Sequence, residues 1–170
     1  GLVSGGGELG GGTIEFMGNS SFLITSIHGL NNNVLRADSG ATLNLTIGNQ
    51  NTASFGGFSL AGPGNINWYS NGFQGDFEGG VSQFTGTIEL FGNNGNLIRI
   101  DPSDIGFANA TVILSPNTSI HPRDTNRVTA LGALNGGPTT GISGAQYQVG
   151  IAGHTSTFSD NITNNGENIS

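Results

Sequence analysis

The chain has 170 residues, of which 31 are glycine and only 9% carry a charge. Glycine costs about 1 kcal/mol relative to alanine at each helical position, which argues against long helices. The formal net charge is −7, with four arginines and no lysine. Nucleic acid and anionic membranes are therefore disfavoured as partners, because phosphates are normally met by clustered basic side chains. The absence of cysteine excludes disulfides, cysteine–zinc sites and thiol catalysis.

Length and composition together predict one folded domain over residues 1–170. The chain is 34% hydrophobic and contains ten Phe, so it does not resemble a chain that stays disordered through high charge and low hydrophobicity. Its first residues, Gly1 to Ser4, look like a cut into a longer polypeptide. We expect a module excised from a larger secreted, extracellular bacterial protein.

Short apolar bursts recur along the chain, with apolar side chains at every second position, which is the pattern of a β-strand. Gly and Asn close most bursts, and both residue types accept the positive φ of tight turns. The clearest bursts, in chain order, are 13–16, 22–24, 43–47, 66–68, 87–90, 97–100, 111–114, 128–131 and 147–149.

The centres of seven of these bursts, all except 13–16 and 97–100, follow one another at an irregular period of about 21 residues, within the range of solenoid repeats. The spacing predicts an all-β fold, a right-handed parallel β-helix (solenoid) of about seven to eight coils. Recurrent Asn turns favour it, since stacked coils would align them as ladders. A β-sandwich is the alternative, because closely spaced short strands with turn signals also describe one.

The C-terminal third contains an R-V-T-A-L-G-A-L-N-G-G segment at 127–137, a Q-Y-Q-V-G-I-A-G segment at 146–153 and S-T-F-S-D-N-I at 156–162. This pattern resembles the autotransporter-associated β-strand repeat, in which similar segments follow one another. Ile151 and Ala152 replace the usual Gly-Leu, and Asp160 stands where the family often has Gly. The resemblance implies a parallel β-helix in a secreted or surface protein.

The size of the chain, its few charges and its aromatic residues give a weaker resemblance to the β-helical xylan-binding carbohydrate-binding modules attached to xylanases of gut bacteria. This resemblance implies a role in binding plant cell-wall polysaccharide.

The richest local cluster lies at residues 65–80, which hold the only Trp, one of two Tyr and two carboxylates among amides. Sugars stack their C–H faces on aromatic rings and offer hydroxyls to amides and carboxylates, and ligand sites pair apolar surface with a few polar groups. The candidate ligand-binding residues are Trp68, Tyr69, Asn67, Asn71, Phe73, Gln74, Asp76 and Glu78.

The alternative is that this cluster belongs to the core, with Trp68, Phe73 and Phe77 pointing inward. Trp68 and Tyr69 are adjacent, so on a strand only one of them can point outward. At least one of the two rings is then expected to be an outward platform.

Other chemistry finds weaker support in the sequence. We expect no cofactor and no metal, with calcium at 72–80 a minor alternative, because only one incomplete copy of a calcium nonapeptide is present. A glycosidase needs two carboxylates at about 5–10 Å, and Asp76 with Glu78 or Glu89 would be candidates. His121, Arg123 and Arg127 lie close in sequence, a pattern more typical of a polar loop. We therefore expect no enzymatic activity.

The sequence predicts a non-catalytic carbohydrate-binding module that recognises a plant cell-wall polysaccharide, with xylan the first candidate. Its role would be to bring a covalently linked glycoside hydrolase to that substrate. A structural stalk or adhesin passenger segment of a bacterial surface protein is the alternative. Ice binding is a third, weaker one, since T-x-T pairs occur only at 85–87 and 155–157. The strands at the two ends of a solenoid have unpaired edges, which favour association. A homodimer therefore stays an alternative to a monomer.

Overall fold

The structure, a computed structural model, describes residues 2–5, 11–24, 33–47, 54–55, 58–70, 75–77, 79–92, 97–100, 106–121, 128–137, 140–142, 146–151, 153 and 155–158. Within these ranges the chain forms β-strands and no helix. None of the described residues forms a helix long and apolar enough to cross a bilayer. The prediction of an all-β chain is confirmed.

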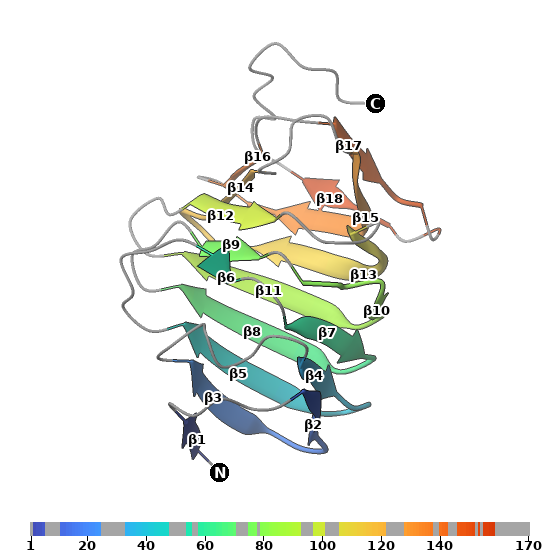
Figure 1. Ribbon diagram of the computed structural model, residues 1–170. Helices are drawn as coiled ribbons and strands as arrows, with labels where there is room; N and C mark the ends of the chain where they lie inside the picture. The colour runs from blue at the N-terminus through green and yellow to red at the C-terminus, as the bar shows by residue number, and fades with distance from the viewer. Residues whose placement is uncertain are drawn as a thin grey trace.

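The strands lie in three sheets, here called A, B and C (Figure 1). Sheet A contains, in order, β1 (Leu2–Gly5), β3 (Ser20–Ile24), β5 (Thr42–Ile47), β8 (Asn65–Ser70), β11 (Thr87–Gly92), β13 (Gly106–Leu114), β15 (Val128–Gly136) and β17 (Gln146–Val149), with β18 (Thr157–Phe158) paired to β15. Sheet B contains β10 (Gln83–Phe84), β7 (Ser59–Gly62), β4 (Asn33–Ala37) and β2 (Gly12–Phe16). Sheet C contains β16 (Gly141–Ile142), β14 (Ser119–His121), β12 (Leu97–Ile100), β9 (Gly75–Phe77) and β6 (Ser54–Phe55).

Neighbouring strands in each described sheet are parallel and come from successive passes of the chain. Figure 1 shows the strands of sheet A stacked one above another, with β1 at one end and β17 at the other. A β-sandwich is built from antiparallel strands, so this alternative is wrong and the parallel solenoid is confirmed. Its right-handed sense stays a prediction, supported by the strong preference of parallel crossovers for that hand.

The number of coils differs from the expected seven to eight. The solenoid has about four turns, and sheet B contains four strands. After β10 in the chain, sheet A contains two nine-residue strands, β13 and β15. Their pairing has a register shift between Phe107 and Thr111. Phe107 meets Phe84 of β10 edge-on, with 6.4 Å between ring centroids. The sequence period did not predict these long strands or the register shift between them.

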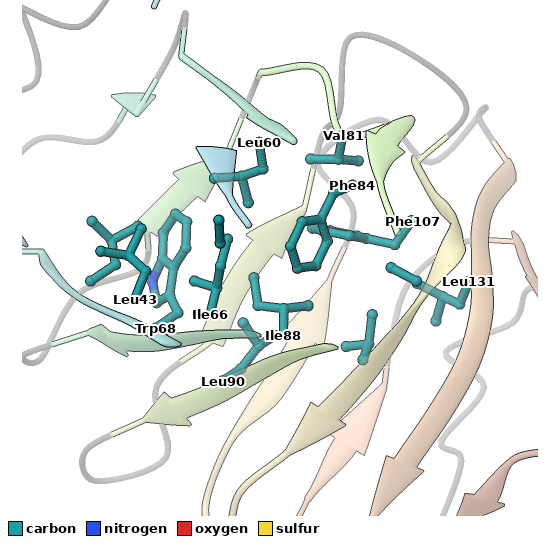
Figure 2. Packing of buried hydrophobic residues seen from close by; sticks show 14 of the residues in the cluster. Leu43, Leu60, Ile66, Trp68, Val81, Phe84, Ile88, Leu90, Phe107 and Leu131 are labelled. Atoms are coloured by element: carbon teal, nitrogen blue, oxygen red, sulfur yellow. The ribbon is translucent and has the colours of Figure 1, made fainter. Parts of the chain in front are cut away.

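The core fills the interior between the three sheets (Figure 2). Sheet A supplies two inward rows whose members pair in register from strand to strand, because alternate side chains point to the same face. Burying each large apolar side chain stabilises the fold by roughly 1.5–3 kcal/mol. The rows contain Leu43, Ile66, Ile88, Val112 and Leu134, and Phe22, Leu45, Trp68, Leu90 and Leu114.

Glycines form the corner where the chain passes from sheet B to sheet A. Gly62 has φ +94°, a conformation that favours glycine. A Cβ on Gly64 or Gly86 would overlap the backbone of the preceding coil, at Asp38 and Gly64 respectively. The chain bends at Pro63 and Gly64, and glycine at this corner permits close approach of successive coils.

Candidate ligand-binding face

The outward side of sheet A brings together polar and aromatic side chains from three consecutive strands. Asn44 of β5, Asn67 of β8 and Glu89 of β11 are aligned in register, and we call them the polar row. Two residues further along the same strands, Tyr69 of β8 and Phe91 of β11 pair with each other, and we call them the aromatic pair. Both groups are half-buried and point away from the core.

Hydrogen bonds fix the polar row. The Asn67 side-chain amide donates to Asn44 Oδ1 at 2.9 Å, an amide ladder between successive coils. The Ser115 hydroxyl, just after β13, donates to Glu89 Oε1 at 2.6 Å. Bonds to a carboxylate are the stronger kind. Each member of the row is therefore held in one orientation before any ligand arrives.

The rings of the aromatic pair stack with 4.6 Å between centroids and 15° between planes. This separation is close to the spacing of about 4.8 Å between neighbouring strands. Such stacking adds roughly 0.5–1.5 kcal/mol beyond the buried area. One face of each ring is covered by the other ring, and the pair remains half-buried on the outward side of sheet A.

Trp68 is not part of this face, which corrects the expectation that it contacts a ligand. Its side chain is only 2% exposed and stacks on Phe58, with 6.3 Å between centroids and 21° between planes. Figure 2 shows it in the interior near Leu43 and Ile66. The reason is that successive side chains on a strand point to opposite faces, so Asn67 and Tyr69 of β8 point outward and Trp68 points inward.

The other residues proposed from the 65–80 cluster do not join this face in the described structure. The backbone of Asp76 lies in β9, a strand of sheet C, whereas Asn67 and Tyr69 lie in sheet A. Four candidates fall outside the described residues, namely Asn71, Phe73, Gln74 and Glu78. Of the eight candidates, the structure places Asn67 and Tyr69 together on the outward side of sheet A.

Phe91, Asn44 and Ser115 belong to this face but were not singled out from the sequence as binding residues. Phe91 pairs with Tyr69, and Asn44 pairs with Asn67, each one coil away. The signal was present in the repeat, because residues one period apart lie side by side in a parallel solenoid. Aligning the bursts by register rather than by centre would have found them.

The residues considered for catalysis are not assembled by the described structure. Glu89 lies in sheet A and the Asp76 backbone in sheet C. His121 ends β14, while Arg123 and Arg127 fall outside the described residues, as does Glu78. No group of three or more His, Asp or Glu side chains suited to a metal occurs among the residues that the structure describes.

A hollow of about 220 Å³ lies on the sheet B side. The Gly80 amide donates to Ser59 Oγ across it at 3.2 Å. It offers neither an aromatic ring nor a charged group, so it is less suited to a sugar than the outward side of sheet A. Its lining residues are Val34, Ser59, Leu60, Gly80, Ser82 and Gln83.

The second tyrosine, Tyr147 of β17, has a different environment from Tyr69. Its side chain is 1% exposed, and desolvation by burial raises the pKa of its hydroxyl. It therefore stays neutral and packs in the core, which leaves Tyr69 as the tyrosine available to a ligand.

No protein-family model, curated protein or solved structure matches the chain. The resemblances to the autotransporter-associated β-strand repeat and to xylan-binding modules stay expectations.

Proposed function

We propose that the protein is a non-catalytic carbohydrate-binding module that recognises a plant cell-wall polysaccharide, with xylan the first candidate. In this role it tethers a covalently linked glycoside hydrolase to its substrate outside the cell. The observation that supports the proposal is the aromatic pair beside the polar row on the outward side of sheet A.

This combination suits the two kinds of surface that a sugar offers. Its C–H groups pack against aromatic rings, and its hydroxyls exchange hydrogen bonds with amides and carboxylates. Asn67 and Tyr69 lie on one strand, with Glu89 and Phe91 in register on the next. A linear polysaccharide that lies along the solenoid axis would contact the polar row and the aromatic pair side by side.

The face is open, so the expected affinity is modest. Half-buried rings and a few hydrogen bonds correspond to micromolar-to-millimolar dissociation constants, roughly −8 to −4 kcal/mol. Such affinity suffices for a tether, since the linked catalytic domain then stays at high effective concentration near its substrate.

Affinity electrophoresis through gels that contain xylan, β-glucan or pectin tests the proposal. We expect retardation of the native protein on xylan and its loss in Tyr69→Ala and Phe91→Ala. Gln83→Ala, at the hollow beside sheet B, is the matched control and should migrate like the native protein. Unretarded migration of the native protein on every polysaccharide would contradict the proposal.

The second candidate is a structural stalk or adhesin passenger segment of a surface protein. The continuous parallel stacking of strands along sheet A favours it, because such a solenoid serves as a spacer without any ligand. It predicts that no glycan retards the protein and that Tyr69→Ala changes only stability. Homodimers through the solenoid ends fit either function, and light scattering at several concentrations would detect them.

A further inference from the structure

Glu89 is the one charged side chain in the described strands of sheet A. The sequences of these strands contain no Asp, Lys or Arg and no other Glu. The described ion pairs, which join Arg36 to Glu15 and Asp38, involve strands β2 and β4 of sheet B. The charge of Glu89 therefore has no cation from the described strands of its own sheet to offset it.

The position of Glu89 also puts this charge where the ligand would lie. It follows Asn67 in the polar row and stands two residues before Phe91 on the same strand. The Ser115 hydroxyl occupies Oε1 and holds the carboxylate in place. A sugar resting against the aromatic pair would bring its substituents close to this carboxylate.

We infer that Glu89 is a specificity-determining residue that selects neutral glycans and rejects those that carry carboxylates. This inference rests on the proposed function of the same face. Two carboxylates near each other repel, and no arginine of the described sheet A strands can bridge them. At 0.15 M salt the screening length is about 8 Å. The local charge of Glu89 therefore counts for more than the net charge of the whole chain.

Two xylans that differ only at the carboxyl groups of their side chains give the sharpest test. The probes are glucuronoxylan and the same glucuronoxylan after reduction of its carboxyl groups, each titrated calorimetrically at 0.15 M salt. We expect the native protein to bind the reduced form at least tenfold more tightly. In 1 M salt, where the screening length falls to about 3 Å, the difference should shrink.

Glu89→Gln removes the charge while leaving an oxygen that can accept the Ser115 hydrogen bond. We expect this variant to bind both xylans within about threefold of each other. Glu15→Gln, on sheet B, is the control, since it removes one equal charge elsewhere and should keep the tenfold difference.

The outcomes separate the two claims. Equal binding of both xylans by the native protein, or an unchanged difference in Glu89→Gln, overturns the role of Glu89 while the proposed function stands. Absence of binding to both xylans overturns the role of Glu89 and the choice of xylan, and the proposed function falls only if β-glucan and pectin also fail to retard the protein.

Discussion

Adjacent positions on β8 differ in whether their side chains lie in the core or on the outward side of sheet A. Asn67, Trp68 and Tyr69 are consecutive, so the strand sends the indole inward and the two neighbours outward. Composition made the whole segment look like a binding cluster. The alternation of side chains places Trp68 in the core, where it stabilises the fold, and places Asn67 and Tyr69 on the outward side of sheet A.

Trp68→Ala should lower the free energy of unfolding by about 3–5 kcal/mol, because a large buried ring is replaced by a cavity. Urea denaturation followed by circular dichroism measures the change. Met17→Ala is the matched control, since Met17 is 79% exposed and its truncation should change stability by less than about 0.5 kcal/mol. A Trp68→Ala protein as stable as the native one would contradict the core position of this ring.

Ser115→Ala should destabilise the protein by about 1–3 kcal/mol, because it removes the donor that bonds the Glu89 carboxylate. Combining it with Glu89→Ala, which removes the acceptor, in a double-mutant cycle isolates the pair from other effects. Additive losses in the cycle would show that the two side chains do not interact in solution.

At the scale of elements, strand type and turn positions were predictable from the sequence, whereas the arrangement of strands into sheets was only partly so. Alternation in 43–47 and 87–90 marks strands that the structure contains as β5 and β11. The nine-residue length of β13 was not predictable, because its pairing with β15 contains a register shift between Phe107 and Thr111. The sequence also could not show that Asp76 joins sheet C, since sheet membership depends on where the chain turns after β8.

The candidate site was partly predictable for a similar reason. The aromatic and amide content of 65–80 drew attention to Asn67 and Tyr69, both of which lie on the outward side of sheet A. The other half of the site comes from β5 and β11, one coil away on either side. A contiguous segment contains only one coil of such a site, so the remaining residues require the register between coils.

Gly86→Ala should destabilise the solenoid by more than 1 kcal/mol, because the new Cβ would overlap the backbone of Gly64 in the preceding coil. Thermal unfolding measures the effect. Gly18→Ala is the control, since a Cβ at Gly18 would meet nothing within 4 Å. Equal melting temperatures for the two variants would show that the corner tolerates a wider spacing between coils.

At the scale of the whole molecule, the fold is a stack in which each coil contacts mainly its neighbours. Strands in the middle of sheet A, such as β8, pair on both sides, whereas β1 lies at the edge. Stability should therefore vary along the axis, since local opening is easiest where pairing is incomplete.

Hydrogen exchange followed by mass spectrometry should show the slowest exchange in β5, β8 and β11 and faster exchange in β1 and β17. The reason is that amides of central strands become exposed only when several coils open together. Uniform protection from one end to the other would indicate a single cooperative unit and contradict this gradient.

The most direct test of the binding face is a ¹H–¹⁵N NMR titration of the protein with xylohexaose, a short neutral xylan fragment. We predict that the shifted amides cluster on the three central strands of sheet A, at Asn44, Asn67, Tyr69, Glu89 and Phe91, with those at the sheet B hollow unchanged. Shifts confined to the hollow, or no shifts at millimolar ligand, would contradict the account.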